Sequence, residues 1–135
     1  MATDKKLTAQ EAFDVADSMQ AAAAVVLTFR RANKSTLSDQ EYDALVENET
    51  ALRYDADRYR AVGITLMAST SKVTAQNLIA AIDSATIAIE KITHIKQLLE
   101  ILNELVTLGV TIASGNVQSI AKQVTALQAT VRTNT

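Results

Sequence analysis

The longest uninterrupted apolar pattern in the sequence runs from Val73 to Leu108 and contains neither Gly nor Pro. Apolar residues recur there at alternating steps of three and four, which is the spacing of one face of an α-helix. This row consists of Ala75, Leu78, Ile82, Ala85, Ile89, Ile92 and, after an extra step of three, Ile95, Leu99, Leu102 and Val106. A second row widens the apolar face: Leu98, Ile101, Leu105 and Leu108. We therefore expect a central helix at about residues 72–108 that contacts more than one neighbour.

Gly109 directly follows this pattern and is expected to be the C-cap of the central helix, because Gly readily adopts the conformation that ends helices. A bend near Asp83 and Ser84 is an alternative to one straight helix. Beyond Gly115 and Asn116, a regular stripe predicts a last helix at about residues 117–131. The stripe consists of Val117, Ile120, Val124, Leu127 and Val131.

Two capping boxes mark the starts of two earlier helices. Thr8 precedes Glu11 by three positions, and Ser38 precedes Glu41 by three. The side chains of such a pair each bind the free N–H group of the other residue. The boxes predict helices at about residues 9–33 and 39–69, with residues 1–7 as a frayed lead-in. Gly63 leaves an earlier end open for the second helix, which we place near Ser69.

Four long helices with short connections favour neighbours that run in opposite directions. The chain has 135 residues, which corresponds to one domain. We therefore predict an all-α fold for residues 1–135, an antiparallel up-down-up-down four-helix bundle with long helices.

Composition excludes several kinds of chemistry. The chain has no Cys, so it has no disulfide, thiolate nucleophile or Cys-based metal site. Its net charge of −2 and the lack of a basic, aromatic stripe give no reason to expect nucleic-acid binding. The N-terminus has no apolar signal segment, which predicts a cytoplasmic protein, with export that needs no signal peptide as an alternative. The longest uncharged run, Leu105 to Ala121, is too short and polar to predict a membrane span.

A metal site was considered around the single histidine. His94 shares the central helix with three acidic residues, Glu90, Glu100 and Glu104. A di-iron bundle needs Glu-x-x-His on two helices and two further Glu, and the chain has no Glu-x-x-His. We interpret these residues as a solvated helix face. Because no catalytic or phosphate-binding motif occurs either, we predict no catalytic residue, no metal, no cofactor and no enzymatic activity.

The second helix carries most of the candidate contact residues. Its acidic N-terminal half indicates a solvated face or a surface for a basic partner. Tyr54 lies off the apolar stripe, between Arg53 and Asp55, where an exposed aromatic side chain would suit an interface. Arg53 and Asp57 are spaced as an i,i+4 ion pair. The residues that we expect to contact a protein partner are Glu47, Arg53, Tyr54, Asp57 and Arg58.

The C-terminal third of the chain has few charges. After Glu104 the charged residues are Lys122 and Arg132. Such a surface is either buried, in the bundle or in a homo-oligomer, or offered to a membrane. The function that we expect is a non-enzymatic protein-binding helical bundle, such as a small adaptor, a secretion chaperone or a toxin-neutralising immunity protein. The alternative is a membrane-active or secreted protein that rearranges its apolar C-terminal helices on lipid.

Overall fold

The computed structural model describes residues 3–69 and 73–134, and within them it has five helices and two short strands. The prediction of an all-α protein is confirmed, apart from the small sheet. In chain order the elements are β1 (Thr3–Lys6), α1 (Ala9–Ala32), α2 (Asp39–Val62), β2 (Thr65–Ser69), α3 (Ala75–Lys91), α4 (Ile95–Ser114) and α5 (Val117–Thr133).

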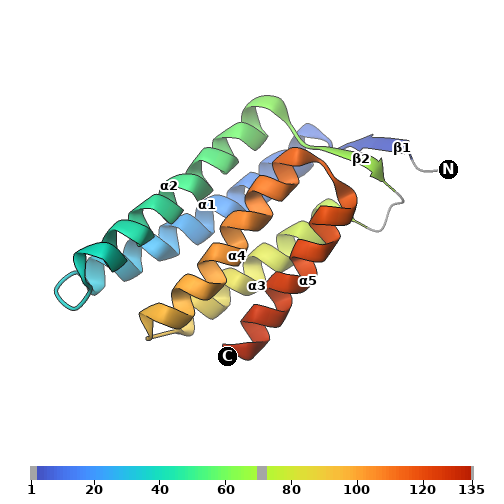
Figure 1. Ribbon diagram of the computed structural model, residues 1–135. Helices are drawn as coiled ribbons and strands as arrows, with labels where there is room; N and C mark the ends of the chain where they lie inside the picture. The colour runs from blue at the N-terminus through green and yellow to red at the C-terminus, as the bar shows by residue number, and fades with distance from the viewer. Residues whose placement is uncertain (1–2, 70–72, 135) are drawn as a thin grey trace.

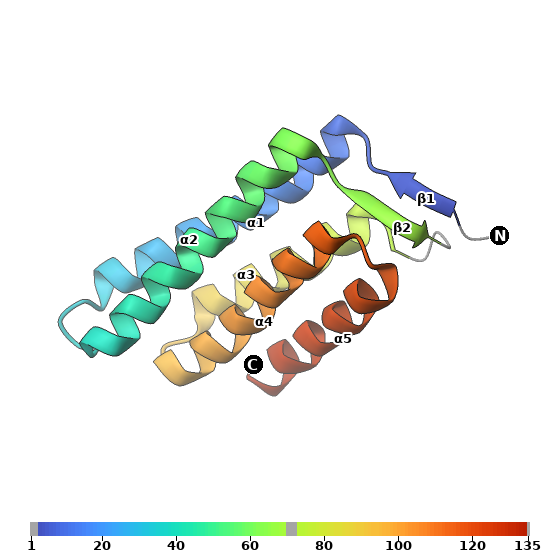
Figure 2. The same cartoon turned by 45° about the horizontal axis from the view of Figure 1, so that its top comes forward.

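The helices lie side by side, and consecutive helices point in opposite directions (Figures 1 and 2). α1 packs against α2 and α3, and α4 packs against α2, α3 and α5. α5 contacts α3 and α4 and lies on the side away from α1 and α2 (Figure 2). The two strands form an antiparallel ribbon at one end of the helices. The ribbon is joined to the α4–α5 connection, because the Met67 N–H donates to the carbonyl oxygen of Gly115 at 2.8 Å.

Both predicted capping boxes are present. The Thr8 hydroxyl accepts from the Glu11 N–H at 3.0 Å, and the Glu11 carboxylate accepts from the Thr8 N–H at 2.9 Å. Ser38 and Glu41 repeat this arrangement at 3.1 and 2.9 Å. The hydrogen bond from the Thr8 backbone lowers the pKa of the Glu11 carboxyl. These boxes fix where α1 and α2 begin, and α1 ends within one residue of its predicted end.

The predicted end of the second helix near Ser69 is wrong. α2 ends at Val62, and Gly63 follows with a φ of 74°, which is unfavourable for residues with a side chain. The chain then alternates with a period of two: Ile64 and Leu66 are buried, whereas Thr65 and Met67 are exposed. This alternation is typical of a strand and does not fit the helix expected over these residues. The resulting strand β2 pairs with residues 3–6, so the expected frayed lead-in is also wrong for these residues, whereas residues 1 and 2 lie outside the part of the chain that the structure describes.

The predicted single helix over residues 72–108 is wrong, and so is the count of four helices. α3 ends at Lys91, Ile92 is extended, and α4 begins at Ile95, at the extra three-residue step in the apolar pattern. The break therefore lies about eight residues beyond the bend considered at Asp83 and Ser84. Gly109 lies inside α4 instead of capping a helix. Gly115 is the C-cap of α4, with a φ of 74°.

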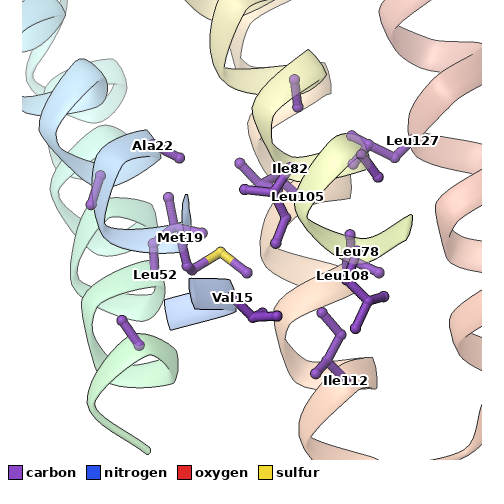
Figure 3. Packing of buried hydrophobic residues seen from close by; sticks show 14 of the residues in the cluster. Val15, Met19, Ala22, Leu52, Leu78, Ile82, Leu105, Leu108, Ile112 and Leu127 are labelled. Atoms are coloured by element: carbon purple, nitrogen blue, oxygen red, sulfur yellow. The ribbon is translucent and has the colours of Figure 1, made fainter. Parts of the chain in front are cut away.

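The core is aliphatic and lies between all five helices. Figure 3 shows Val15 and Met19 of α1 and Leu52 of α2 on one side, facing side chains of α3 and α4. The second apolar row of the C-terminal half (Leu98, Ile101, Leu105 and Leu108) is fully buried within the chain. α5 contributes fewer fully buried side chains, Ile120 and Leu127. Self-association is therefore not needed to cover the second row.

Candidate interaction surface

Two of the five expected contact residues, Arg53 and Asp57, take part in ion pairs within α2. The Arg53 Nε lies 3.1 Å from a carboxylate oxygen of Glu49, and Asp57 lies 3.8 Å from a guanidinium nitrogen of Arg60. The partners of both residues also bind α1. Glu49 binds Arg30 of α1, and Arg60 forms an ion pair with Asp17 of α1 at 2.6 Å. Asp57 is nevertheless exposed, as are the remaining three residues, Glu47, Tyr54 and Arg58.

Tyr54 is 64% exposed, as its place off the apolar stripe predicted. Arg58 follows it by one helical turn and lines a shallow depression of about 280 Å³. Two exposed apolar side chains line the same depression, Val62 at the end of α2 and Met67 in β2, with exposed fractions of 68% and 46%. Figure 2 shows the C-terminal ends of α2 and α4 beside β2, where this depression lies.

α4 completes this surface. Ala113 and Ser114 line the depression, and Val110, one turn earlier in α4, is 61% exposed. Val62 and Met67 thus border one depression together with Arg58, and Tyr54 and Val110 each lie one helical turn from a residue that lines it. We call the set of Tyr54, Arg58, Val62, Met67 and Val110 the corner surface.

Sequence reasoning missed three of these residues for identifiable reasons. Val62 was assigned to the apolar side of a helix that continued to Ser69, whereas α2 ends there. Met67 was assigned to the same helix, although its alternation with Leu66 indicates a strand. Val110 was placed after the helix end expected at Gly109. The alternative end of this helix at Gly63 predicts that Val62 and Met67 lie outside the helical apolar stripe.

Beneath the α1 side of α2 lies a charged network. Glu49 is buried and accepts from the Nε of Arg30 in α1 at 2.7 Å as well as from Arg53. Arg30 also donates to the Tyr42 hydroxyl at 2.8 Å, and its guanidinium lies 5.5 Å from the centre of that ring. The bond to Glu49 raises the pKa of the Arg30 guanidinium. This network explains why an acid interrupts the apolar stripe of α2, and it joins α1 to α2.

A second buried polar group lies between α2 and α4. Asp55 is 4% exposed, and its Oδ2 has no hydrogen-bond partner among the described residues. Burial raises the pKa of the Asp55 carboxyl to about 6, although the nearby Arg58 guanidinium opposes the shift. One turn later, the Tyr59 hydroxyl donates to the carbonyl oxygen of Gly109 at 2.5 Å. Burial, together with the Asp55 charge, raises the pKa of the Tyr59 phenol far above its ordinary value.

Two further grooves lie between helices. The larger, of about 460 Å³, lies between α1 and α3 and is lined by Val25, Phe29, Ile89 and Glu90 together with smaller side chains. A smaller one of about 230 Å³ lies between α3 and α5, beside Asn77 and Val124. Neither brings together acids, bases and nucleophiles. Within residues 3–69 and 73–134, no three His, Cys, Asp or Glu side chains are grouped as a metal site would require.

Two of the described helices, α1 and α4, are long and apolar enough to cross a membrane, judged by length and composition alone. Both helices also supply core residues, such as Met19 and Leu105. Core helices of water-soluble proteins meet the same criterion, so this is weak evidence for a membrane span.

Comparison of the chain with protein-family models, with curated proteins and with solved structures finds no match. The function is therefore inferred from the surface and interior of this chain alone.

Proposed function

We propose that the protein is a non-enzymatic protein-binding helical bundle and that it contacts its partner through the corner surface. The observation that carries the proposal is the depression lined by Arg58 and the exposed Val62 and Met67, with exposed Tyr54 and Val110 one helical turn from residues that line it. Exposed apolar side chains gathered in one place are typical of contact sites. Tyr and Arg are the residues that most often dominate binding energy in such sites.

The geometry refines the contact expected from the sequence. Glu47, Tyr54 and Arg58 remain candidate contact residues, because their side chains are exposed and occur in none of the ion pairs described above. Arg53 is better suited to holding α2 in place, because it pairs with the buried Glu49, whereas the exposed Asp57 also remains a candidate. A small adaptor, a secretion chaperone or an immunity-type protein would each use such a rigid helical face. We infer that its five helices form one up-and-down bundle in the cytoplasm, with the corner surface at one end.

Site-specific photo-crosslinking tests this proposal in the cells that make the protein. A photoreactive amino acid at position 54 should yield a crosslink to one protein partner, and the charge reversal Arg58→Glu should abolish it. The same amino acid at Gln20, an exposed position of α1 outside the corner surface, is the control. The proposal fails if positions 54 and 20 give the same crosslinked species, or if none forms at position 54.

The alternative, a protein that rearranges on lipid, is supported by the length and apolar character of α1 and α4. In this function the buried faces of both helices would have to leave the core and enter the bilayer. Dye-filled vesicles containing anionic lipid distinguish the two functions. Release of dye by the purified protein would support the lipid function, whereas intact vesicles at micromolar protein would contradict it.

A further inference from the structure

The contact of Asp55 with α4 is unusual for a helix interface. A carboxyl group is buried there with one oxygen unpartnered, and the facing residue is Gly109, where any side chain would collide with that oxygen. Both features lower stability, since an unpaired buried polar group and a Gly inside a helix are each unfavourable. The site therefore suits a protonated carboxyl far better than an ionised one.

We propose that Asp55, Tyr59 and Gly109 form a pH-dependent conformational switch between α2 and α4. When Asp55 is protonated, the Tyr59 hydroxyl binds the Gly109 carbonyl and joins the two helices. When Asp55 loses its proton to solvent, its carboxylate becomes the stronger acceptor for the single Tyr59 proton. The hydroxyl then turns towards Asp55, and the α2–α4 bond at Gly109 is lost.

The positions of the three residues allow this exchange. Asp55 and Tyr59 are four residues apart on α2, so their side chains lie on the same face. Both side chains also reach Gly109, because the Tyr59 hydroxyl donates to its carbonyl oxygen and Asp55 Oδ2 occupies the space beside its Cα atom. Tyr59 also lines the depression at the end of α2, which gives water a way to the pair when the helices separate.

Few charges compete with this exchange. From α1, the nearest group at the Gly109 position is the uncharged Met19 methyl group, and α4 presents the Gly109 backbone. On α2 itself, the Arg58 guanidinium acts on the Asp55 carboxyl, and the Asp55 charge in turn acts on the Tyr59 phenol. Arg58 is exposed, so solvent screens its charge. Burial therefore dominates the titration of Asp55.

Nuclear magnetic resonance can follow this switch, because the chain has only three Gly. We expect the amide and carbonyl resonances of Gly109 to shift with a midpoint near pH 6, the same midpoint as the Asp55 carboxyl carbon. Gly63 and Gly115 should not follow that curve. The proposal is overturned if the Asp55 carboxyl carbon titrates near the ordinary value of 3.8, or if Gly109 does not follow Asp55.

Matched variants assign the titration. Asp55→Asn should remove the shift at Gly109, whereas Asp43→Asn, which changes an exposed carboxylate on the same helix, should leave it intact. Tyr59→Phe should uncouple the two groups, so that Asp55 titrates at a higher pH while the Gly109 carbonyl no longer follows. An ordinary histidine titrates in the same range, so His94→Gln should retain the shift. Loss of the Gly109 shift in His94→Gln would overturn the assignment to Asp55. If Asp55→Asn does not fold, the titration of the Asp55 carboxyl carbon in the wild-type protein still tests the proposal.

Discussion

The carboxyl group of Asp55 occupies the space that a side chain at Gly109 would need. A Cβ atom at position 109 would collide with Asp55 Oδ2, and it would lie 3.2 Å from Asp55 Cγ and 3.4 Å from the Met19 methyl carbon. α2, α1 and α4 therefore meet at a point where the α4 backbone itself forms the surface. Two residues that each look unfavourable alone, a buried acid and a Gly inside a helix, fit each other.

Gly109→Ala is expected to destabilise the protein by about 1–3 kcal/mol because of this collision. Elsewhere in a helix the same change would stabilise by about 1 kcal/mol. Urea denaturation followed by circular dichroism measures the difference. In an Asp55→Ala background the space is empty, so adding Gly109→Ala should be neutral or stabilising. A stabilised Gly109→Ala in the wild-type background would contradict the packing described here.

The pairing of Asp55 with Gly109 also shows what the sequence could reveal. Periodicity and capping boxes predicted the helical class, the starts of α1 and α2 and nearly the whole of α1, because local patterns determine these features. These patterns did not predict that β2 pairs with residues 3–6, because no local signal links segments some sixty residues apart. Gly109 was misinterpreted for a similar reason. Its role depends on Asp55, a contact between distant parts of the chain.

The candidate surface was predictable only in part. Exposure of Tyr54 followed from helical spacing alone. Val62 and Met67 are exposed because α2 ends at Gly63, and Val110 is exposed because α4 continues through Gly109. Both Gly residues were considered as helix ends, and the sequence offered no means of deciding between them, because Gly occurs both at C-caps and at close helix contacts.

Stability should fall as the pH rises through the titration of Asp55. The carboxyl pKa is about 6 in the folded protein and 3.8 as an ordinary group, so between these values the folded state retains a proton that the unfolded state has lost. Linkage then requires stability to decrease from about pH 4 to above pH 6, by about 1–3 kcal/mol. Urea midpoints at several pH values measure this effect. Asp55→Asn should reduce the dependence of the urea midpoint on pH and raise the midpoint at neutral pH. If the midpoint of this variant still falls with pH as steeply as in the wild type, the effect belongs to other groups.

Glu49→Ala is expected to cost about 1–3 kcal/mol, because it leaves the half-buried Arg30 without its carboxylate partner. The matched control is Glu47→Ala, two residues earlier on the same helix, where the side chain is exposed. That change should alter the free energy of unfolding by less than about 0.5 kcal/mol. Equal effects of the two substitutions would show that the Arg30–Glu49 pair does not hold α1 against α2.

Leu105→Ala should cost about 2–5 kcal/mol, because the side chain is fully buried in the aliphatic core (Figure 3). Leu99 belongs to the first apolar row of the sequence, which alone would predict an equal loss. The structure leaves Leu99 only partly buried, so Leu99→Ala should cost less, about 1–2 kcal/mol. Thermal denaturation of both variants compares them directly. A larger loss for Leu99→Ala would mean that α4 is rotated about its axis relative to the arrangement described here.

Two tyrosines five residues apart on α2 should respond differently to loss of the hydroxyl group. Tyr59→Phe removes the 2.5 Å hydrogen bond to Gly109 in a buried site and is expected to cost about 1–2 kcal/mol at pH 5. Tyr54→Phe removes a solvent-exposed hydroxyl and should leave the free energy of unfolding unchanged within about 0.5 kcal/mol. Because the proposed switch moves the Tyr59 hydroxyl to the ionised Asp55 carboxylate, which is the stronger acceptor, the loss for Tyr59→Phe should grow at pH 8. A loss that is the same or smaller at pH 8 would contradict the exchange of Tyr59 between Gly109 and Asp55.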